Sequence, residues 1–138
     1  MPKKKILVVD DSQDALNILE AVLKRGGFKV QVVSNGEEAL RKIRKFPPDL
    51  VLLDMMMPKM DGLEVCRILK GDPGLSHIPI LMLSAKDDPA LHERALQVGA
   101  SAFIEKPVHP REVLRKIKTY FYEADRASKA RSDHSACG

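Results

Sequence analysis

The chain has 138 residues, enough for one ordinary domain that buries an apolar core without disulfides or structural zinc. Its two cysteines form neither a CxxC site nor a disulfide framework, and no apolar run approaches the ~18 residues of a membrane span, so we expect a soluble protein of the reducing cytosol. The net charge of +4 lies on basic faces of predicted helices, and there is no zinc or helix-turn-helix pattern, so we expect no direct binding to nucleic acid or to membranes.

Five apolar runs of strand length follow one another along the chain, separated by segments of helical length. Several runs are almost entirely apolar instead of alternating, which is typical of parallel strands that helices cover on both faces. The predicted strands span residues 5–10, 29–34, 49–54, 78–84 and 102–106.

The intervening segments carry apolar residues at helical spacing, and each begins at a recognisable cap. Ser34, for example, stands three residues before Glu37, which is the capping-box pattern of a helix N-terminus. Because strands and helices alternate through short connections, the sequence predicts an α/β fold with a doubly wound, five-stranded parallel sheet and five helices. The predicted helix starts are Ser12, Ser34, Asp61, Asp88 and His109.

Beyond about residue 122 the apolar stripe of the last helix fades into a polar segment. We therefore expect residues 1–122 to form the folded domain. Residues 123–138 are expected to be a flexible tail, a frayed continuation of the last helix or the start of a linker. The chain is then either a stand-alone domain or the first domain of a longer protein.

Polar side chains stand at the ends of four predicted strands: Asp10 and Asp11 after the first, Asp54 after the third, Ser84 after the fourth and Lys106 after the fifth. Open α/β sheets place their ligands at the carboxyl ends of the strands, so we expect these groups to meet in one site. Each aspartate taken alone is equally typical of a helix or turn cap. The conjunction of the four strand ends is what indicates a site.

This set of groups suits a divalent metal and a phosphoryl group. Adjacent carboxylates supply the oxygen ligands that Mg²⁺ prefers. Asp54 is the predicted nucleophile, because a carboxylate can attack phosphorus when a cation neutralises the phosphoryl oxygens. Ser84 offers a hydroxyl donor and Lys106 a positive charge, and a cis bond between Lys106 and Pro107 would aim that charge inward.

Five motifs in order resemble the receiver domain of two-component response regulators, the CheY-like domain. The resemblance covers residues 5 to about 122 and implies the flavodoxin-like strand order 2-1-3-4-5 of that family. The matching motifs are LVVDD at 7–11, DLVLLDMMMPKMDG at 49–62, LSAK at 83–86, GA at 99–100 and FIEKP at 103–107.

The resemblance implies a role for each acidic position. Asp54 matches the phosphorylated aspartate, and Asp10 and Asp11 match the acidic pair that binds Mg²⁺ (or Mn²⁺) together with Asp54. Met56, two residues after the phosphoacceptor, matches the position that offers its backbone carbonyl to the metal. An apolar side chain at that position is then compatible with a hard-cation site.

Three further positions match residues that respond to the phosphoryl group. Ser84 matches the hydroxyl, and Lys106 the lysine, that hold it. Phe103 matches the switch aromatic; it can swing inward as a tyrosine does, but it has no hydroxyl to offer a partner. Plain core packing is the alternative for Phe103.

The implied function is a phosphorylation-controlled signalling switch of a two-component phosphorelay, not an enzyme acting on a separate substrate. Such a domain supports its own phosphorylation and a slow autodephosphorylation. The expected donor is a sensor histidine kinase or a histidine phosphotransfer protein, because the chain's own histidines form no ligand-spaced cluster. A downstream protein, an output domain or a second copy is expected to bind the surface of the fourth helix, fifth strand and fifth helix.

Three alternatives remain at this stage. A phosphatase of the haloacid dehalogenase type would need a second aspartate where Met56 stands. A receiver-like module that no longer accepts phosphate would conserve the fold without the chemistry. A flavin-binding protein of similar topology would need a phosphate-binding loop after the first strand, and that loop is absent from the sequence.

Overall fold

The computed structural model describes residues 3–137 except residues 56, 58–60, 86–88 and 107–108. At residues 85, 106 and 128–137 it describes the backbone alone. The chain forms two compact units, residues 1–108 and residues 109–138, and each is described by itself.

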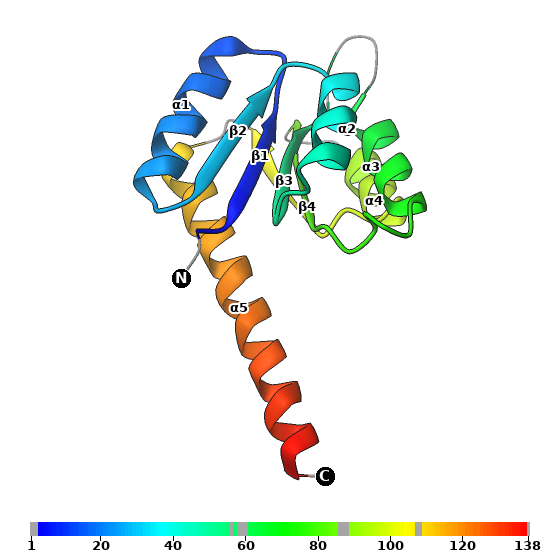
Figure 1. The fold of residues 1–138 in the computed structure, drawn as a ribbon. Coiled ribbons are helices and arrows are strands. Elements are labelled where there is room, and N and C mark those ends of the chain that lie inside the picture. Colours follow the sequence, from blue (N-terminus) through cyan, green and yellow to red (C-terminus); the bar gives the residue numbers. More distant parts are fainter. Residues whose placement is uncertain (1–2, 56, 58–60, 86–88, 107–108, 138) are drawn as a thin grey trace. The chain divides into compact units, whose positions relative to one another are not determined.

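Five parallel strands form one sheet in the order β2-β1-β3-β4-β5 (Figure 1). This arrangement confirms the predicted doubly wound sheet, and the strand ends lie within two residues of the predicted ones. The strands are β1 (Lys5–Val9), β2 (Lys29–Val33), β3 (Leu50–Asp54), β4 (Ile80–Ala85) and β5 (Ala102–Lys106).

Helices alternate with the strands as predicted, and two of the predicted caps are confirmed. The Ser12 hydroxyl accepts a hydrogen bond from the backbone N–H of Ala15 at 3.3 Å, and an Asp61 oxygen accepts one from that of Glu64 at 2.9 Å. The helices are α1 (Gln13–Arg25), α2 (Gly36–Lys45), α3 (Gly62–Gly71), α4 (Pro89–Gln97) and α5 (Pro110–Cys137).

The predicted start of the second helix at Ser34 was wrong by one residue. Asn35 is the cap of α2, and its side-chain oxygen accepts a hydrogen bond from the backbone N–H of Glu38 at 2.9 Å. Asn35 has the extended backbone that a cap requires, with φ −152° and ψ 164°. Since Asn and Ser are similarly good caps, local sequence preference does not distinguish the two positions.

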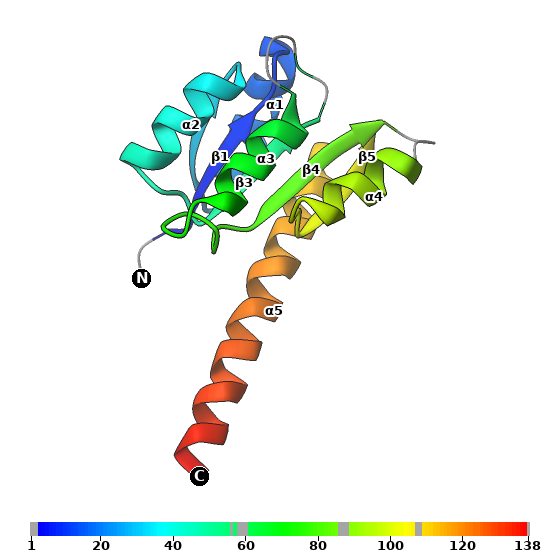
Figure 2. The same ribbon diagram turned by 90° about the vertical axis from the view of Figure 1, so that its right-hand side faces the viewer.

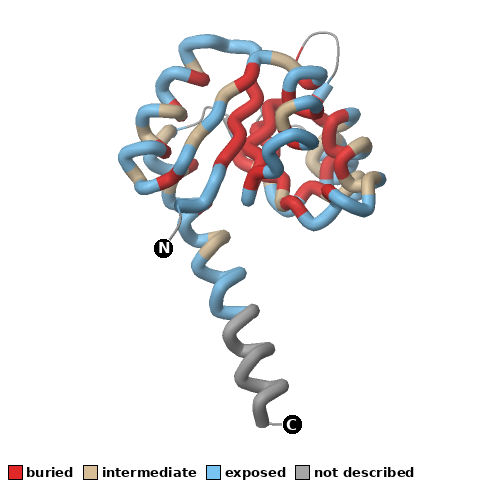
Figure 3. The backbone as a smooth tube through the Cα atoms, in the orientation of Figure 1, coloured by how far each residue is buried: buried red, intermediate tan, exposed pale blue. Residues whose placement is uncertain are grey.

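The two faces of the sheet carry different helices (Figures 1 and 2). Leu7, Leu53 and Met82 belong to a buried cluster with residues of α2, α3 and α4. Val8 and Leu52 alternate with them and are fully buried on the face where α1 lies. The central strands are therefore covered on both sides, as the buried trace in Figure 3 shows, and this explains their continuous apolar sequence.

In the second unit, α5 continues from Pro110 to Cys137, so the backbone of residues 123–137 follows the helical alternative. The division of the chain into a domain and a tail at residue 122 stays a prediction. Within the described ranges, no helix has both the length and the apolar character needed to cross a membrane.

Lys70, near the end of α3, stabilises the segment that connects α3 to β4. Its ammonium donates hydrogen bonds to the carbonyls of Ser76 and Ile78 at 3.0 and 2.8 Å, and burial lowers the pKa of Lys70. Gly99, with φ +105°, lies against the stem of this side chain, and a Cβ there would come within 2.6 Å of Lys70 Cγ. The turn before β5 thus requires glycine for two reasons, its backbone conformation and its lack of a side chain.

Alanine substitutions at three glycines separate the effect of the backbone conformation from the effect of the contact with Lys70. Gly99→Ala should lower the free energy of unfolding by about 2 to 3 kcal/mol, because strain and displacement of Lys70 combine. Gly27→Ala should cost about 1 kcal/mol, since Gly27 has φ +97° but open space around it. Gly71→Ala, in a helix with open space, should be neutral or slightly stabilising. Urea denaturation measures all three, and equal losses at Gly99 and Gly27 would refute the contact with Lys70.

Candidate functional site

The parallel register brings the predicted strand-end groups to one edge of the sheet. Val9 of β1 pairs with Leu53 of β3, so Asp10 and Asp54 follow at the same level. Asp54 in turn pairs with Leu83, and Ser84 is the next residue of β4. The carboxyl ends of β1, β3 and β4 therefore lie side by side, which brings Asp10, Asp54 and Ser84 to one edge of the sheet.

The three aspartates lie together. One carboxylate oxygen from each of Asp10, Asp11 and Asp54 lies within 4.8 Å of the other two. Asp10 and Asp54 are only 4% and 2% exposed, whereas Asp11 is exposed. Buried like charges at this separation repel one another, and a hard divalent cation with oxygen ligands would offset that repulsion. The donor set therefore fits Mg²⁺ or Mn²⁺.

Asp10 also has the local role that the capping alternative proposed. One of its carboxylate oxygens accepts a hydrogen bond from the backbone N–H of Ser12 at 2.9 Å. Ser12 caps α1, so this bond ties the orientation of the Asp10 carboxylate to the start of that helix. The capping and metal-site interpretations of Asp10 are thus compatible.

Gly62 allows α3 to begin directly against the end of β3. Its backbone N–H donates to the carbonyl of Met55 at 3.0 Å. A Cβ at Gly62 would lie 2.5 Å from the Asp54 carbonyl oxygen and 2.8 Å from Met55 Cα. A side chain at this position would displace the backbone that carries Asp54, which explains the glycine of the MDG sequence physically.

Ser84 is fully buried and makes a contact that the sequence analysis missed. Its hydroxyl lies 2.7 Å from Nε2 of His92, in the first turns of α4. The His92 ring lies against Phe103 of β5, with ring centroids 3.9 Å apart and planes tilted by 34°. No pattern in the sequence singled out His92; in the structure it lies three residues before buried Ala95, on the inward face of α4.

Two predicted site residues are only partly described or lie outside the described residues. Lys106 ends β5, where its backbone pairs with Ala85 at the same edge of the sheet. Met56 and the Lys106–Pro107 bond lie outside the described residues. Phe103 is half-buried and packs against the core cluster, which agrees with both of its proposed roles.

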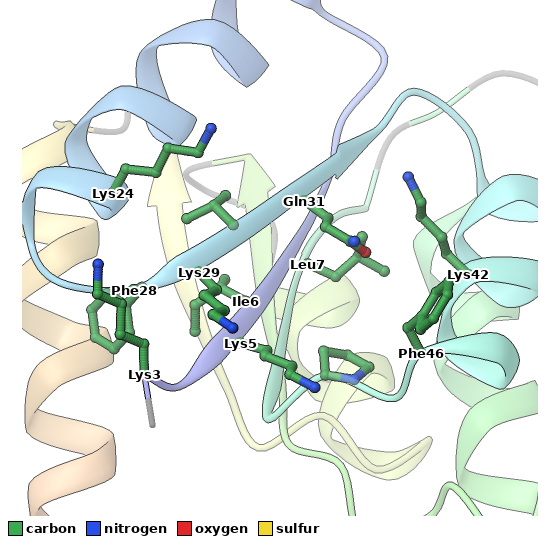
Figure 4. A pocket seen from close by; sticks show the side chains of 12 residues that line it. Lys3, Lys5, Ile6, Leu7, Lys24, Phe28, Lys29, Gln31, Lys42 and Phe46 are labelled. Carbon is green, nitrogen blue, oxygen red and sulfur yellow. The ribbon is translucent and has the colours of Figure 1, made fainter. Parts of the chain in front are cut away.

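A hollow of about 570 Å³ lies at the opposite end of the sheet, where β1 and β2 begin (Figure 4). Among the described residues that line it there is no carboxylate, and the polar groups are mainly ammonium groups. The two ends of the sheet thus differ in charge, and the acidic end carries the candidate chemistry. The lysines that line the hollow are Lys3, Lys5, Lys24, Lys29 and Lys42.

Comparison with known protein families agrees with the fold and with this acidic edge. Residues 6–118 match the model of the response regulator receiver domain. The chain belongs to this family. The membership confirms the resemblance seen in the sequence and favours the receiver over the phosphatase and flavoprotein alternatives, which belong to other families.

Two curated relatives show how this receiver chain compares with longer regulators. It is 42% identical over 125 residues to the alkaline phosphatase synthesis transcriptional regulatory protein PhoP of Bacillus subtilis, covering 91% of this chain and 51% of PhoP. It is 41% identical over 116 residues to the DNA-binding response regulator MtrA of Mycobacterium tuberculosis, covering 84% of this chain and 50% of MtrA. The chain therefore spans about half the length of these relatives.

Solved structures share the fold closely. The chemotaxis response regulator CheY4 of Vibrio cholerae is 30% identical, with a TM-score of 0.81 over 86% of this chain and 98% of CheY4. The receiver domain of a signal transduction histidine kinase from Syntrophus aciditrophicus is 38% identical, with a TM-score of 0.78 over 84% of this chain and 88% of that one. Receivers of this shape thus occur in proteins of different architecture.

If the carboxylate cluster binds Mg²⁺, the ion should stabilise the folded protein, and thermal or chemical unfolding measures this gain. At Mg²⁺ ten times above its dissociation constant, the wild type should gain about 1.4 kcal/mol of stability, because the cation binds the folded state alone. Asp11→Asn should lose most of this gain and should be more stable than the wild type without Mg²⁺, since one of three repelling charges is removed. Asp14→Asn, in the first turn of α1 and outside the cluster, is the matched control. An equal Mg²⁺ gain in Asp11→Asn would argue against this metal site.

Proposed function

We propose that this receiver is a phosphorylation-controlled switch in which Asp54 accepts a phosphoryl group from the phosphohistidine of a sensor kinase or phosphotransfer protein. The observation that carries the proposal is the placement of a buried carboxylate, Asp54, within 4.8 Å of two others at the sheet edge that also holds Ser84. A cluster of this kind suits a phosphoryl group with its cation better than it suits an organic substrate.

The chemistry requires one new bond and one broken bond. A carboxylate oxygen of Asp54 attacks the phosphorus in line with the leaving histidine nitrogen; the P–O bond forms as the P–N bond breaks, and the imidazole leaves with the electron pair. The ion held by Asp10, Asp11, Asp54 and the backbone carbonyl of Met56 would neutralise the phosphoryl oxygens. The low exposure of Asp54, 2%, limits the approach of water to the acyl phosphate, so autodephosphorylation is slow.

Ser84 and Lys106 are the residues proposed to hold the transferred group. The Ser84 hydroxyl donates a hydrogen bond to one phosphoryl oxygen, and the Lys106 ammonium supplies positive charge to another. Both residues belong to strands that end at this edge of the sheet, where Ser84 of β4 pairs with Glu105 and the next residue, Ala85, pairs with Lys106 of β5. Binding at Ser84 then affects His92, which it contacts, and through His92 it affects Phe103 and the surface of α4 and β5.

The output is proposed to be a change in what this surface binds. PhoP is named a transcriptional regulatory protein and MtrA a DNA-binding response regulator, and the match with this chain covers about half of each. We propose that a downstream protein, an output domain or a second copy of the receiver binds α4 and β5, with the direct contact to DNA made elsewhere. A cytoplasmic location fits this exchange between a kinase and a regulator.

Phosphorylation by a small-molecule donor tests the proposal. Acetyl phosphate with Mg²⁺ should give the wild type one acid-stable, base-labile phosphate, and Asp54→Asn should take up none, because the amide cannot act as the nucleophile. EDTA should suppress labelling of the wild type, and Asp14→Asn should label normally. Equal labelling of Asp54→Asn and wild type, measured by intact-protein mass spectrometry, would refute Asp54 as the acceptor and leave the other carboxylates to be tested.

A further inference from the structure

His92 joins two residues of the switch that come from different strands. Its Nε2 lies 2.7 Å from the Ser84 hydroxyl, at the end of β4, and its ring lies 3.9 Å from that of Phe103, on β5. The neighbouring positions of α4 are also inward, with Ala95 fully buried and Leu91 packed against the core cluster. His92 is therefore part of the contact between α4 and the sheet.

If Nε2 of His92 carries no proton, it accepts the hydrogen bond that Ser84 donates. A serine hydroxyl has a single O–H donor, and a neutral imidazole nitrogen without a proton accepts such a bond. When Ser84 donates to His92, the same proton cannot be donated to a phosphoryl oxygen on Asp54. His92 and the phosphoryl group then compete for Ser84.

The ring contact extends this competition to Phe103. The tilted arrangement at 3.9 Å is a close aromatic contact, in which His92 covers part of a half-buried phenylalanine. Loss of the bond to Ser84 removes one of the contacts with described residues that orient the imidazole. The position of Phe103 and the inner face of α4 consequently depend on where the Ser84 proton is directed.

We propose that His92 is a latch that holds the receiver in its unphosphorylated arrangement. Ser84 donates to Nε2 of His92 in that arrangement; a phosphoryl group on Asp54 takes over this hydrogen bond, and the freed imidazole alters the packing of Phe103 and α4. The inference rests on the proposed phosphorylation of Asp54 and adds the residue that sets how readily the switch responds. His92 is a positioning residue, since it acts through Ser84 and does not touch the reacting atoms.

Titration with beryllium fluoride, a phosphoryl mimic, tests the latch. His92→Phe keeps an aromatic ring beside Phe103 but removes the acceptor for Ser84, so the unphosphorylated arrangement loses a hydrogen bond. The full-length chain with this change should bind beryllium fluoride, in the presence of Mg²⁺, roughly 2- to 10-fold more tightly than the wild type, the range that follows from one hydrogen bond. His77→Phe, the same change at an exposed site, should bind as the wild type does. Unchanged or weaker binding by His92→Phe would overturn the latch.

A measurement on the wild type covers the case in which His92→Phe fails to fold. The ¹⁵N resonance of His92 Nε2 reports directly on its hydrogen bond, and addition of beryllium fluoride with Mg²⁺ should shift it towards the value found in Ser84→Ala. The exposed His77 should not shift. A His92 resonance that stays in place while amide signals around Asp54 change would also overturn the latch.

The same titration separates failure of this inference from failure of the proposed function. If the wild type shows no saturable response to beryllium fluoride with Mg²⁺ at Asp54, the phosphorylation proposal fails, and the latch fails with it. If the wild type binds the mimic normally but His92 does not respond, the phosphorylation proposal stands and only the latch is refuted.

Discussion

The mutual repulsion of three carboxylates is the constraint on which the rest of this structure depends. Asp10, Asp11 and Asp54 lie within 4.8 Å of one another, and two of them are almost completely buried. Such an arrangement persists only on a rigid support. Strand β3 and residues 6–9 of β1, which are buried, supply that support. The hydrogen bond from the backbone N–H of Ser12 to Asp10 and the close approach of Gly62 to the Asp54 backbone complete it.

The strands that carry Asp10 and Asp54 differ in their packing from the elements around Ser84. β1 and β3 lie at the centre of the sheet, covered on both faces, and are poorly placed to move. Ser84 of β4, His92 of α4 and Phe103 of β5 are linked by a hydrogen bond and a ring contact. In the proposed function, Asp54 stays fixed while a small change at Ser84 alters the surface of α4 and β5.

The relatives contain the same receiver domain in proteins of different length. The match covers about half of MtrA and of PhoP, whereas it covers 98% of CheY4. The three carboxylates and the Ser84 hydroxyl of this acidic edge all come from residues 10–84. In the proposed function the α4 and β5 surface binds the partner, so the residues that link this surface to Asp54 are the ones to compare among receivers.

The sequence by itself predicted the strands and their parallel arrangement, because nearly continuous apolar runs are typical of parallel strands that helices cover on both faces. The strand order that brings Asp10, Asp54 and Ser84 to one edge came from the resemblance to receiver domains, and the structure has that order. The sequence also identified Ser12 and Asp61 as caps, since capping depends on residues three apart. Tertiary structure decided between Ser34 and Asn35, two equivalent caps. It alone revealed the contacts of His92, because the rotation and height of α4 on the sheet are set by packing among distant side chains and not by any local pattern.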